Sequence, residues 1–513
     1  MKPVLTIAAA GVLALSLAAC AGQPSGPATG GAQTFANGRT FTMVLPADPG
    51  NLDPHRTALS VTLQVDRFLY DSLLNTNEKG ESVAGLADKW EATTTSATFT
   101  LRKGITCSDG TALTASTVAA NINFIGDPAN ASTRIGLWVP PGATATADDA
   151  AGTVTVTSPA PSAFLDRSLG STQIVCDKGM KDRELLKQNA VGTGMFTVTE
   201  AVPGDHYTLE RRKDYAWGPG DWKTDQQGLP DRVVLRVISN ESTAANLLTS
   251  GEVNVSAFIG PDQQRLQGQQ LHQRDVSAML GQLWFNEKAG LPGADEAVRR
   301  ALTQALDLEQ LRAALTSGTG KPATGLVSPS LSPCEQSDAP AKLPTHNVEQ
   351  ARSALDTAGW RPGGDGIRGK DGTKLSLTFY YVTELGPTMQ ATAELVQRFW
   401  QAVGVEVGTR GAAQAEINQV IVGGQGSWDA VVLPLNTGLP SDLVPFFSGP
   451  TPPDGTNFAG IQNSEYATAV REASAIAGTA GCARWNAAEQ ALIERVDIVP
   501  FANSNRPVFG KGA

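Results

Sequence analysis

Residues 97–125 have the sequence ATFTLRKGITCSDGTALTASTVAANINFI, in which a strand, a turn and a helix follow one another. Apolar and polar side chains alternate from Ala97 to Arg102, which is typical of a half-buried strand. Ser108-Asp109-Gly110 then joins three turn-forming residues. Thr114 supplies a hydroxyl that can cap the first turn of the helix that follows. This succession indicates a protein of mixed α/β structure.

Further strands and helices alternate along the rest of the chain. Strands are predicted at residues 40–45, 151–157, 195–200, 206–211, 232–239, 283–286, 375–382, 403–408 and 428–433. Helices are predicted at residues 57–74, 181–189, 241–250, 295–306 and 388–402. The length of 513 residues allows roughly two to four domains, and no repeat of fixed period is visible. We therefore expect a mixed α/β chain with several lobes.

The composition excludes several classes of protein. A hydrophobic content of 41% is enough for folded cores, so the chain as a whole is not intrinsically disordered. Lys and Arg total 40 against 50 for Asp and Glu, and the resulting net charge of -10 disfavours a nucleic-acid partner. The four His and five Cys residues include no Cys-x-x-Cys or His-x-x-x-His spacing. Neither a zinc site nor another cofactor is expected.

The N-terminus has the features of an export signal. A basic start is followed at residues 4–19 by an uncharged apolar run, which at about sixteen residues is shorter than the ~20 that a membrane-spanning helix needs. Leu17-Ala18-Ala19-Cys20 resembles the bacterial lipobox, in which the Cys receives a diacylglycerol before cleavage; the alternative is an ordinary secretory signal. Residues 21–38 are rich in Gly, Pro and Ala, which predicts a flexible linker. We expect a lipid anchor on Cys20, at the outer face of the cytoplasmic membrane.

Nine separated blocks of sequence carry a further signal. They are LDPH at 52–55, YDSLL at 70–74, LADKWEA at 86–92, FTLRKGITCSDGTALTA at 99–115, GTGMFTV at 192–198, LTSGEVN at 248–254, FNEKAGLPGADEAVRRALTQALD at 285–307, DGIRGKDGTKLSL at 365–377 and VDIVPF at 496–501. In this order they resemble the family-5 extracellular solute-binding lipoproteins of peptide and nickel type ABC importers. Most blocks also have a purely structural interpretation: Asp371-Gly372 closes a hairpin, and the apolar residues of 298–306 form one buried helix face. The blocks therefore identify the scaffold and say little about the ligand.

The resemblance implies an α/β, two-lobed, periplasmic-binding-protein-like fold (type II, cluster C) with an extra small domain on the first lobe. After the signal peptide at 1–20 and the linker at 21–38, the expected units are lobe I at 39–74, 191–280 and 486–513, the extra domain at 75–190, and lobe II at 281–485. Because the chain would cross between the lobes several times, closure would bend a few hinge residues and would not refold either lobe.

Four cysteines remain after Cys20, in a compartment where disulfides persist. They allow three pairings. We favour Cys107 with Cys176 and Cys334 with Cys482, because each pair falls within one expected lobe or at its edge. The alternative is four isolated buried thiols.

No constellation of catalytic residues is present. Gly320-Lys321 has Leu315 where a phosphate-binding loop would begin with glycine, and no Gly-x-Ser-x-Gly motif occurs. The adjacent Asp148-Asp149 falls in an expected loop, where a solvated turn is the simpler interpretation. We therefore do not expect an enzyme.

The resemblance places ligand contacts in two segments. The candidates are Arg56 and Thr57 after the LDPH block, and Asn436, Thr437, Gly438 and Asp442 after the strand at 428–433. In peptide-binding relatives an Asp-Tyr pair in the second segment holds the α-amino group of the peptide, whereas Asn436-Thr437 stands there in this chain. An amide cannot provide the charge-assisted bond that a buried ammonium needs, so a peptide ligand would require another acid such as Asp442.

Two aromatic residues complete the set of candidates. Trp284 can stack on a ligand or pack in the core, and Tyr381 can face the cleft or the interior. His55 is more typical of a hydrogen-bonded structural histidine than of a ligand contact. With four histidines, nickel binding is not expected unless a chelator carries the metal.

The predicted function is that of a substrate-binding lipoprotein of an ABC importer. It would capture a short peptide or another small polar solute between its lobes, close around it, and present it to the permease. We expect a monomer that is attached to the membrane through Cys20. The alternative is a cell-envelope lipoprotein that keeps the fold as an interaction scaffold and does not take part in transport.

Overall fold

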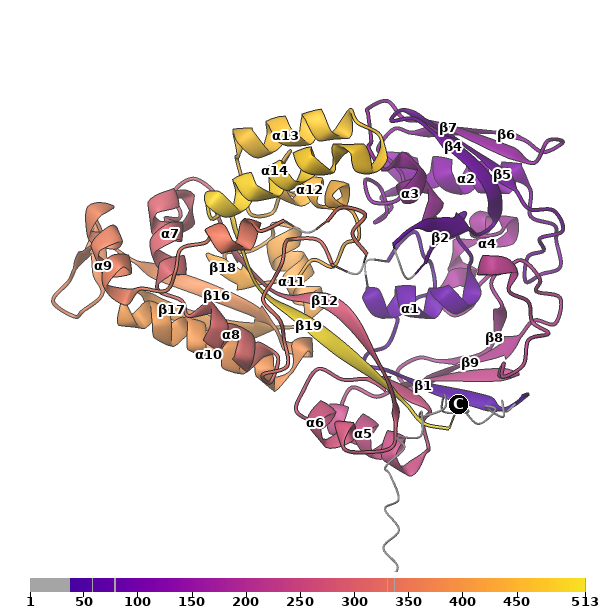
Figure 1. Cartoon of the computed structure of the whole chain (residues 1–513), viewed down its shortest axis with the longest axis horizontal. Helices are drawn as coiled ribbons and strands as arrows, with labels where there is room; N and C mark the ends of the chain where they lie inside the picture. The colour runs from indigo at the N-terminus through magenta and orange to yellow at the C-terminus, as the bar shows by residue number, and fades with distance from the viewer. Residues whose placement is uncertain (1–36, 58, 78–79, 330, 336, 513) are drawn as a thin grey trace, which may run out of the picture.

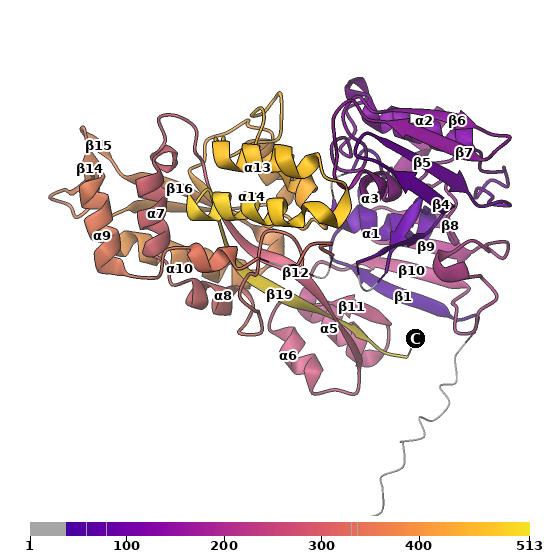
Figure 2. The ribbon, with the colours of Figure 1, turned by 45° about the horizontal axis from the view of Figure 1, so that its top comes forward.

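The structure is a computed structural model that describes residues 37–512, apart from residues 58, 78–79, 330 and 336. The signal peptide, Cys20 and nearly all of the linker lie outside the described residues. Two halves are joined by a pair of long strands, β12 (His272–Phe285) and β19 (Ile498–Gly510), which lie side by side in both views (Figure 1, Figure 2).

One ten-stranded sheet runs through both halves. Its order is β17 (Glu406–Ala412), β16 (Ser376–Val382), β18 (Ala430–Val432), β12, β19, β11 (Val255–Ala257), β1 (Thr40–Leu45), β10 (Arg232–Val237), β9 (His206–Arg211) and β8 (Phe196–Val202). β12 pairs with β18 at one end of the ribbon, and β19 pairs with β11 at the other. The two halves are therefore the two ends of a continuous sheet.

The β12–β19 ribbon is irregular near its middle. The antiparallel register runs from His272 opposite Gly510 to Trp284 opposite Ile498, with shifts between Met279 and Gln282. β12 is exposed at its N-terminal end and fully buried from Met279 onward. The strand predicted at 283–286 is therefore only the buried end of a longer strand.

The first lobe contains β1 and β8–β11. β1 pairs in parallel with β10 and lies under α1 (Ser60–Leu69), which is shorter than the helix predicted at 57–74. Val65 and Leu69 of α1 pack in the same core as Leu45 and Leu235. α5 (Glu241–Ser250) has the predicted bounds and ends at Gly251, whose φ of 85° suits glycine. With α6 (Asp262–Gln267), α5 lies beside the end of the ribbon in both views.

The extra domain has a sheet and a core of its own. Its antiparallel order is β4 (Ala87–Ala92), β5 (Ser96–Leu101), β7 (Thr153–Thr157) and β6 (Thr144–Asp148), and the remaining elements are β2 (Leu74–Thr76), β3 (Ser82–Ala84), α2 (Ala115–Gly126), α3 (Leu165–Gly170) and α4 (Asp177–Lys181). Thr114 accepts the Thr117 N–H and caps α2, as the sequence predicts. The helix predicted at 181–189 is wrong, because α4 ends at Lys181 and Asp182 caps a separate 3₁₀ turn.

The second lobe surrounds β16–β18 with helices. These are α7 (Glu296–Gln304), α8 (Leu308–Leu315), α9 (Val348–Thr357), α10 (Pro387–Ala402), α11 (Gln414–Ile417), α12 (Val444–Phe447), α13 (Ser464–Ser474) and α14 (Cys482–Glu494). A small sheet of β13 (Arg361–Pro362), β14 (Arg368–Lys370) and β15 (Thr373–Lys374) contains the predicted hairpin, in which Asp371 and Gly372 have φ of 50° and 78°. Val298, Ala301 and Leu302 on α7 are fully buried, as the predicted helix face requires.

The C-terminal segment divides between the two lobes. Leu492, Ile493 and Val499 pack in the core of the second lobe, whereas Phe509 packs with α5 and β11 in the first. The chain therefore re-enters the first lobe within β19, later than residue 486.

Both disulfides that the sequence favours are present. Cys107 pairs with Cys176 at the junction of the first lobe and the extra domain, and Cys334 pairs with Cys482 in the second lobe. Within the described part of the chain, no helix has the length and apolar character needed to span a membrane.

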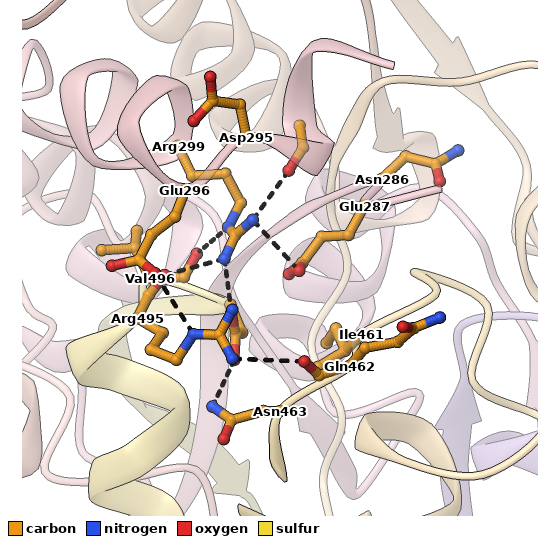
Figure 3. Close-up of polar contacts among 12 residues, drawn as sticks. Asn286, Glu287, Asp295, Glu296, Arg299, Ile461, Gln462, Asn463, Arg495 and Val496 are labelled. Atoms are coloured by element: carbon orange, nitrogen blue, oxygen red, sulfur yellow. Dashed lines mark hydrogen bonds and ion pairs between the residues drawn. The ribbon is translucent and has the colours of Figure 1, made fainter. Parts of the chain in front are cut away.

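A buried ionic cluster fixes α7 to the C-terminal segment (Figure 3). Arg299 is 1% exposed, and its guanidinium lies 2.6 Å from Asp497 and 3.2 Å from Glu287. It also donates to the carbonyls of Gly293 and Val496. Burial raises the pKa of Glu287 to about 8, with Asp497 raising it further and Arg299 opposing the shift. The cluster is structural, since it lies away from the cavity described below.

Candidate functional site

A cavity of about 1100 Å³ lies between the two lobes. The first lobe and the extra domain contribute most of its wall, including α1 and the loops at 134–138 and 215–230. The second lobe contributes Leu331 and the segment at 436–442. Because both lobes line the cavity, a solute that spans it can contact both of them.

Aromatic side chains dominate the first-lobe side of the cavity. They are Phe41, Phe68, Tyr70, Trp138, Phe196, Tyr215 and Trp222. Phe68 and Phe196 meet edge to face with ring centroids 5.8 Å apart, and the Tyr70 hydroxyl donates to the Leu52 carbonyl at 2.8 Å. These contacts fix the orientations of the rings, so the wall is largely preformed.

Asp71 lies at the base of this aromatic wall. Its carboxylate accepts hydrogen bonds from the Tyr215 hydroxyl and from Trp217 Nε1, each at 3.0 Å. Burial raises the pKa of Asp71 to about 6, and the two hydrogen bonds limit the rise. Asp71 therefore serves to position the aromatic side chains.

Arg134 is a second polar feature of the wall, contributed by the extra domain. The residue is 6% exposed, and its guanidinium lies over the Trp138 ring at 5.0 Å from the centroid. Nε donates to the Pro54 carbonyl at 3.3 Å, and Nη2 donates to the Thr57 carbonyl. Burial lowers the pKa of Arg134 to about 10, so the side chain remains charged at neutral pH.

The second-lobe wall follows β18 directly. Asn436 uses its side-chain oxygen to accept the Met279 N–H at 2.8 Å, which ties this segment to the ribbon. Gly438 lies close to Leu331, since a Cβ at Gly438 would be 3.3 Å from the Leu331 Cβ. Asp442 sits in the 3₁₀ helix Pro440–Leu443, and burial raises its pKa to about 7.

The structure brings together four of the predicted contact residues. Asn436, Thr437, Gly438 and Asp442 all line the cavity. Arg56 and Thr57 do not line it: Arg56 is exposed and lies over the Phe124 ring, while the Thr57 carbonyl supports Arg134 from behind.

The two aromatic candidates also lie outside the cavity lining. Trp284 is fully buried, stacks on Phe447 with ring centroids 4.9 Å apart, and donates to the Leu433 carbonyl. Tyr381 packs against the second-lobe core. Core packing, which the sequence left open for Trp284, is therefore what the structure has. His55 is buried and bonded to the Gln173 carbonyl and to Arg183, in keeping with a structural role.

Sequence reasoning missed the residues that shape most of the wall. Arg134, Trp138, Tyr215 and Trp222 lie outside the regular helices and strands, where no periodicity marks them. The only feature of these residues that the sequence shows is an aromatic or basic side chain in a segment predicted to be a loop. Among the described residues, no group of three or more potential metal ligands comes together.

Comparison with known proteins agrees with this geometry. The model of the bacterial extracellular solute-binding proteins of family 5 matches residues 81–456. Oligopeptide-binding protein AppA of Bacillus subtilis is 26% identical over 58% of the chain, and the chain spans only 53% of the length of AppA in this match. Periplasmic murein peptide-binding protein MppA of Escherichia coli is 27% identical over 96% of the chain and 91% of its own length.

Solved structures share the two-lobed fold. A substrate-binding protein from Microbacterium hydrocarbonoxydans, complexed with 4-hydroxybenzoate hydrazide, has a TM-score of 0.76 at 25% identity, covering 92% of this chain and 95% of its own. AppA in complex with a nonapeptide has a TM-score of 0.73 at 20% identity, covering 92% and 94%. The family match extends over residues 81–456, and the solved structures share the fold over 92% of the chain. The chain belongs to the bacterial extracellular solute-binding proteins of family 5.

Proposed function

We propose that this protein is the substrate-binding component of an ABC importer and captures its solute between the two lobes. The observation that carries the proposal is a cavity of about 1100 Å³ with walls from both lobes. A solute that contacts both walls stabilises the closed arrangement and shifts the population toward it. The closed form is then the one that a permease recognises.

The proposed ligand is a short peptide or another small polar solute. The names of the relatives support peptides, since AppA is an oligopeptide-binding protein and MppA a murein peptide-binding protein. Asp442 supports an amine on the ligand, because it provides a carboxyl group in the segment where Asn436 and Thr437 replace the expected acid. The aromatic wall fits apolar parts of the solute.

A scaffold without transport is the less favoured function. Such a protein would be expected to fill its cleft with its own side chains, whereas this cavity has room for a ligand. Partial burial of charged groups around an open space is typical of a binding site.

The proposal includes export and a lipid anchor on Cys20, with the permease as partner and the protein as a monomer. The sequence Leu17-Ala18-Ala19-Cys20 supports the anchor. Metabolic labelling with a radioactive fatty acid should label the native chain and not Cys20→Ser. Labelling of both proteins, or of neither, would contradict the anchor.

A thermal-shift screen tests the binding function. Peptides, amino-acid conjugates, organic acids, sugars and metal chelates should include at least one ligand that raises the melting temperature. Trp222→Ala, which removes a cavity-lining ring, should weaken that ligand about tenfold. Tyr381→Phe, a conservative change at an aromatic residue outside the cavity, is the control and should bind like the native chain. Silence across the whole panel, or equal binding by both variants, would contradict the proposal.

A further inference from the structure

The guanidinium of Arg134 is buried beside the cavity without a carboxylate partner. Two of its nitrogens, Nε and Nη2, donate to the backbone carbonyls of Pro54 and Thr57. The third, Nη1, has no hydrogen-bond partner among the described residues and is not fully buried. Arg134 lines the cavity, so a solute bound there can reach this nitrogen if it approaches the exposed side of the guanidinium.

The acidic residues near Arg134 do not neutralise it. No ion pair within 4.0 Å joins Arg134 to an acid in the described part of the chain, and Asp53 is already paired with Arg183 at 2.7 Å. Asp66 is completely buried, and neither of its carboxyl oxygens has a hydrogen-bond partner. Burial raises the pKa of Asp66 well above its ordinary value, with Asp53 adding to the rise and Arg134 opposing it. Burial thus favours the neutral form of this carboxyl group, which makes no ion pair with Arg134.

An uncompensated charge that is largely removed from water is unfavourable unless an opposite charge reaches it. The position of Arg134 is fixed by its two carbonyl partners and by the Trp138 ring, so little side-chain entropy remains to be lost on binding. A planar guanidinium in a fixed position is well suited to a carboxylate, which accepts its N–H groups in charge-assisted hydrogen bonds.

We propose that Arg134, together with the Trp138 ring beside it, forms a subsite for a carboxylate group of the ligand. This inference rests on the proposed function, and it narrows the solute to an organic acid. The carboxylate can come from a peptide C-terminus or from a non-peptide acid. Asp442, which lines the same cavity from the second lobe, is separately available for an amine on the same ligand.

Arg67 provides the matched control for this subsite. It lines the same cavity and carries the same charge, but it is exposed and is held by no hydrogen bond among the described residues. Water screens an exposed guanidinium, so its loss should change the affinity for an acid only slightly. A difference between Arg134 and Arg67 therefore separates a built subsite from the general charge of the cavity.

The experiment compares acids with their neutral amides. Isothermal titration would use alanylphenylalanine against its C-terminal amide, and 3-phenylpropanoate against 3-phenylpropanamide, among further pairs of peptides and aryl acids. The native protein should bind at least one acid about tenfold or more tightly than its amide. Arg134→Gln should remove this preference, whereas Arg67→Gln should retain it. If the acid that binds is a peptide, the carboxylate is a peptide C-terminus. If it is an aryl acid, the carboxylate belongs to a non-peptide solute.

The outcomes separate the subsite from the wider function. Equal binding of acids and amides by the native protein would overturn the subsite and leave the receptor function standing. An equal loss of preference in Arg67→Gln would also overturn it, because general charge would then explain the effect. Silence of every acid and every amide would contradict both. If Arg134→Gln unfolds, Arg134→Lys keeps the charge but loses the fork of donors, and a reduced acid preference is expected.

Discussion

Arg299 and Arg134 are both buried guanidinium groups, but they have different partners. Arg299 lies within 3.2 Å of the carboxyl groups of Glu287 and Asp497, and it joins α7 to the C-terminal segment. Arg134 donates only to backbone carbonyls and lines the cavity. The first arginine is neutralised from within the protein and serves the architecture. The second has no ion pair with an acid among the described residues, and it lines the cavity.

Glu287 makes the stability of the second lobe dependent on pH. Its pKa in the folded protein is about 8, above the ordinary value of 4.5, so the folded state binds its proton more tightly than the unfolded state. The stability that this proton provides is complete below pH 4.5 and is lost as the pH rises through 8. Between these pH values, the free energy of unfolding of Glu287→Gln should therefore fall less than that of the native chain, by on the order of 3 kcal/mol.

Urea unfolding of both proteins across this pH range checks the prediction. The conservative variant Glu296→Gln is the control, since Glu296 is a partly exposed neighbour whose pKa is lowered by its contacts with Arg300 and Arg495. Its profile should keep the native loss of stability between these pH values. Parallel curves for Glu287→Gln and the native chain would show that Glu287 does not titrate in this range.

Family resemblance located the residues of one wall of the site and missed those of the other. Asn436 and Asp442 could be placed because they follow a recognisable strand, and both line the cavity. Arg134 could not be placed, since its position depends on carbonyls 80 and 77 residues away in sequence. Trp284 was ambiguous because an aromatic residue at the end of a strand suits a core as well as a cleft.

At the scale of elements, Gly192 and Gly194 allow a loop to cross the end of α1. A Cβ at Gly192 would lie 2.3 Å from the Leu69 carbonyl oxygen, and a Cβ at Gly194 would lie 2.4 Å from the Leu69 carbonyl carbon. Real Cβ atoms do not approach backbone this closely, so only glycine permits the contact. The GTG sequence is thus a packing requirement at the junction that supports Tyr70 and Asp71 of the cavity wall.

Gly192→Ala should destabilise the protein by about 1–3 kcal/mol through this overpacking. Gly408→Ala on β17 is the control, because nothing lies within 4 Å of a Cβ there and the backbone does not require glycine. Thermal unfolding of the two variants should show a lower melting temperature for Gly192→Ala alone. Equal melting temperatures would contradict the prediction, because they would mean that α1 and the loop can move apart to fit the added methyl group without loss of stability.

Helices and strands that carry caps or a regular apolar pattern in their own sequence could be predicted. Strand segments whose conformation depends on pairing with a distant strand could not. α5 has a side-chain cap at Asn240 and a left-handed glycine at its end, and its predicted bounds are correct. β12 was recognised only near its buried end. Residues 272–278 of this strand are exposed or half-buried and show no useful alternation, so the partner β19 determines their strand conformation. Non-local pairing of this kind leaves no local pattern.

At the scale of the whole molecule, ligand binding should protect both walls of the cavity together. Hydrogen–deuterium exchange with a saturating ligand from the screen should slow exchange at residues 67–76 of the first lobe and at 436–442 of the second. At about 100 times the Kd, the ligand also adds roughly 2.7 kcal/mol to the stability of the folded state. Protection confined to one lobe would contradict capture between the two.

The strand content of each lobe was largely predictable, but the single sheet that joins the lobes was not. The sequence suggested two lobes with hinge segments, whereas β12 and β19 hydrogen-bond to each other over nearly their whole length. This arrangement depends on residues more than 200 positions apart, as in the pairing of His272 with Gly510.

The register shift between Met279 and Gln282 gives the joined lobes a mechanical property. In a regular antiparallel ribbon the ladder of hydrogen bonds is continuous. A bulge interrupts this ladder locally and bends the strand. Asn436 in the second-lobe wall of the cavity accepts the Met279 N–H, which ties this wall to the interrupted part of the ribbon. We therefore expect a solute that displaces the segment at 436–442 to act on the ribbon at this interruption, where a small displacement would rotate one lobe against the other.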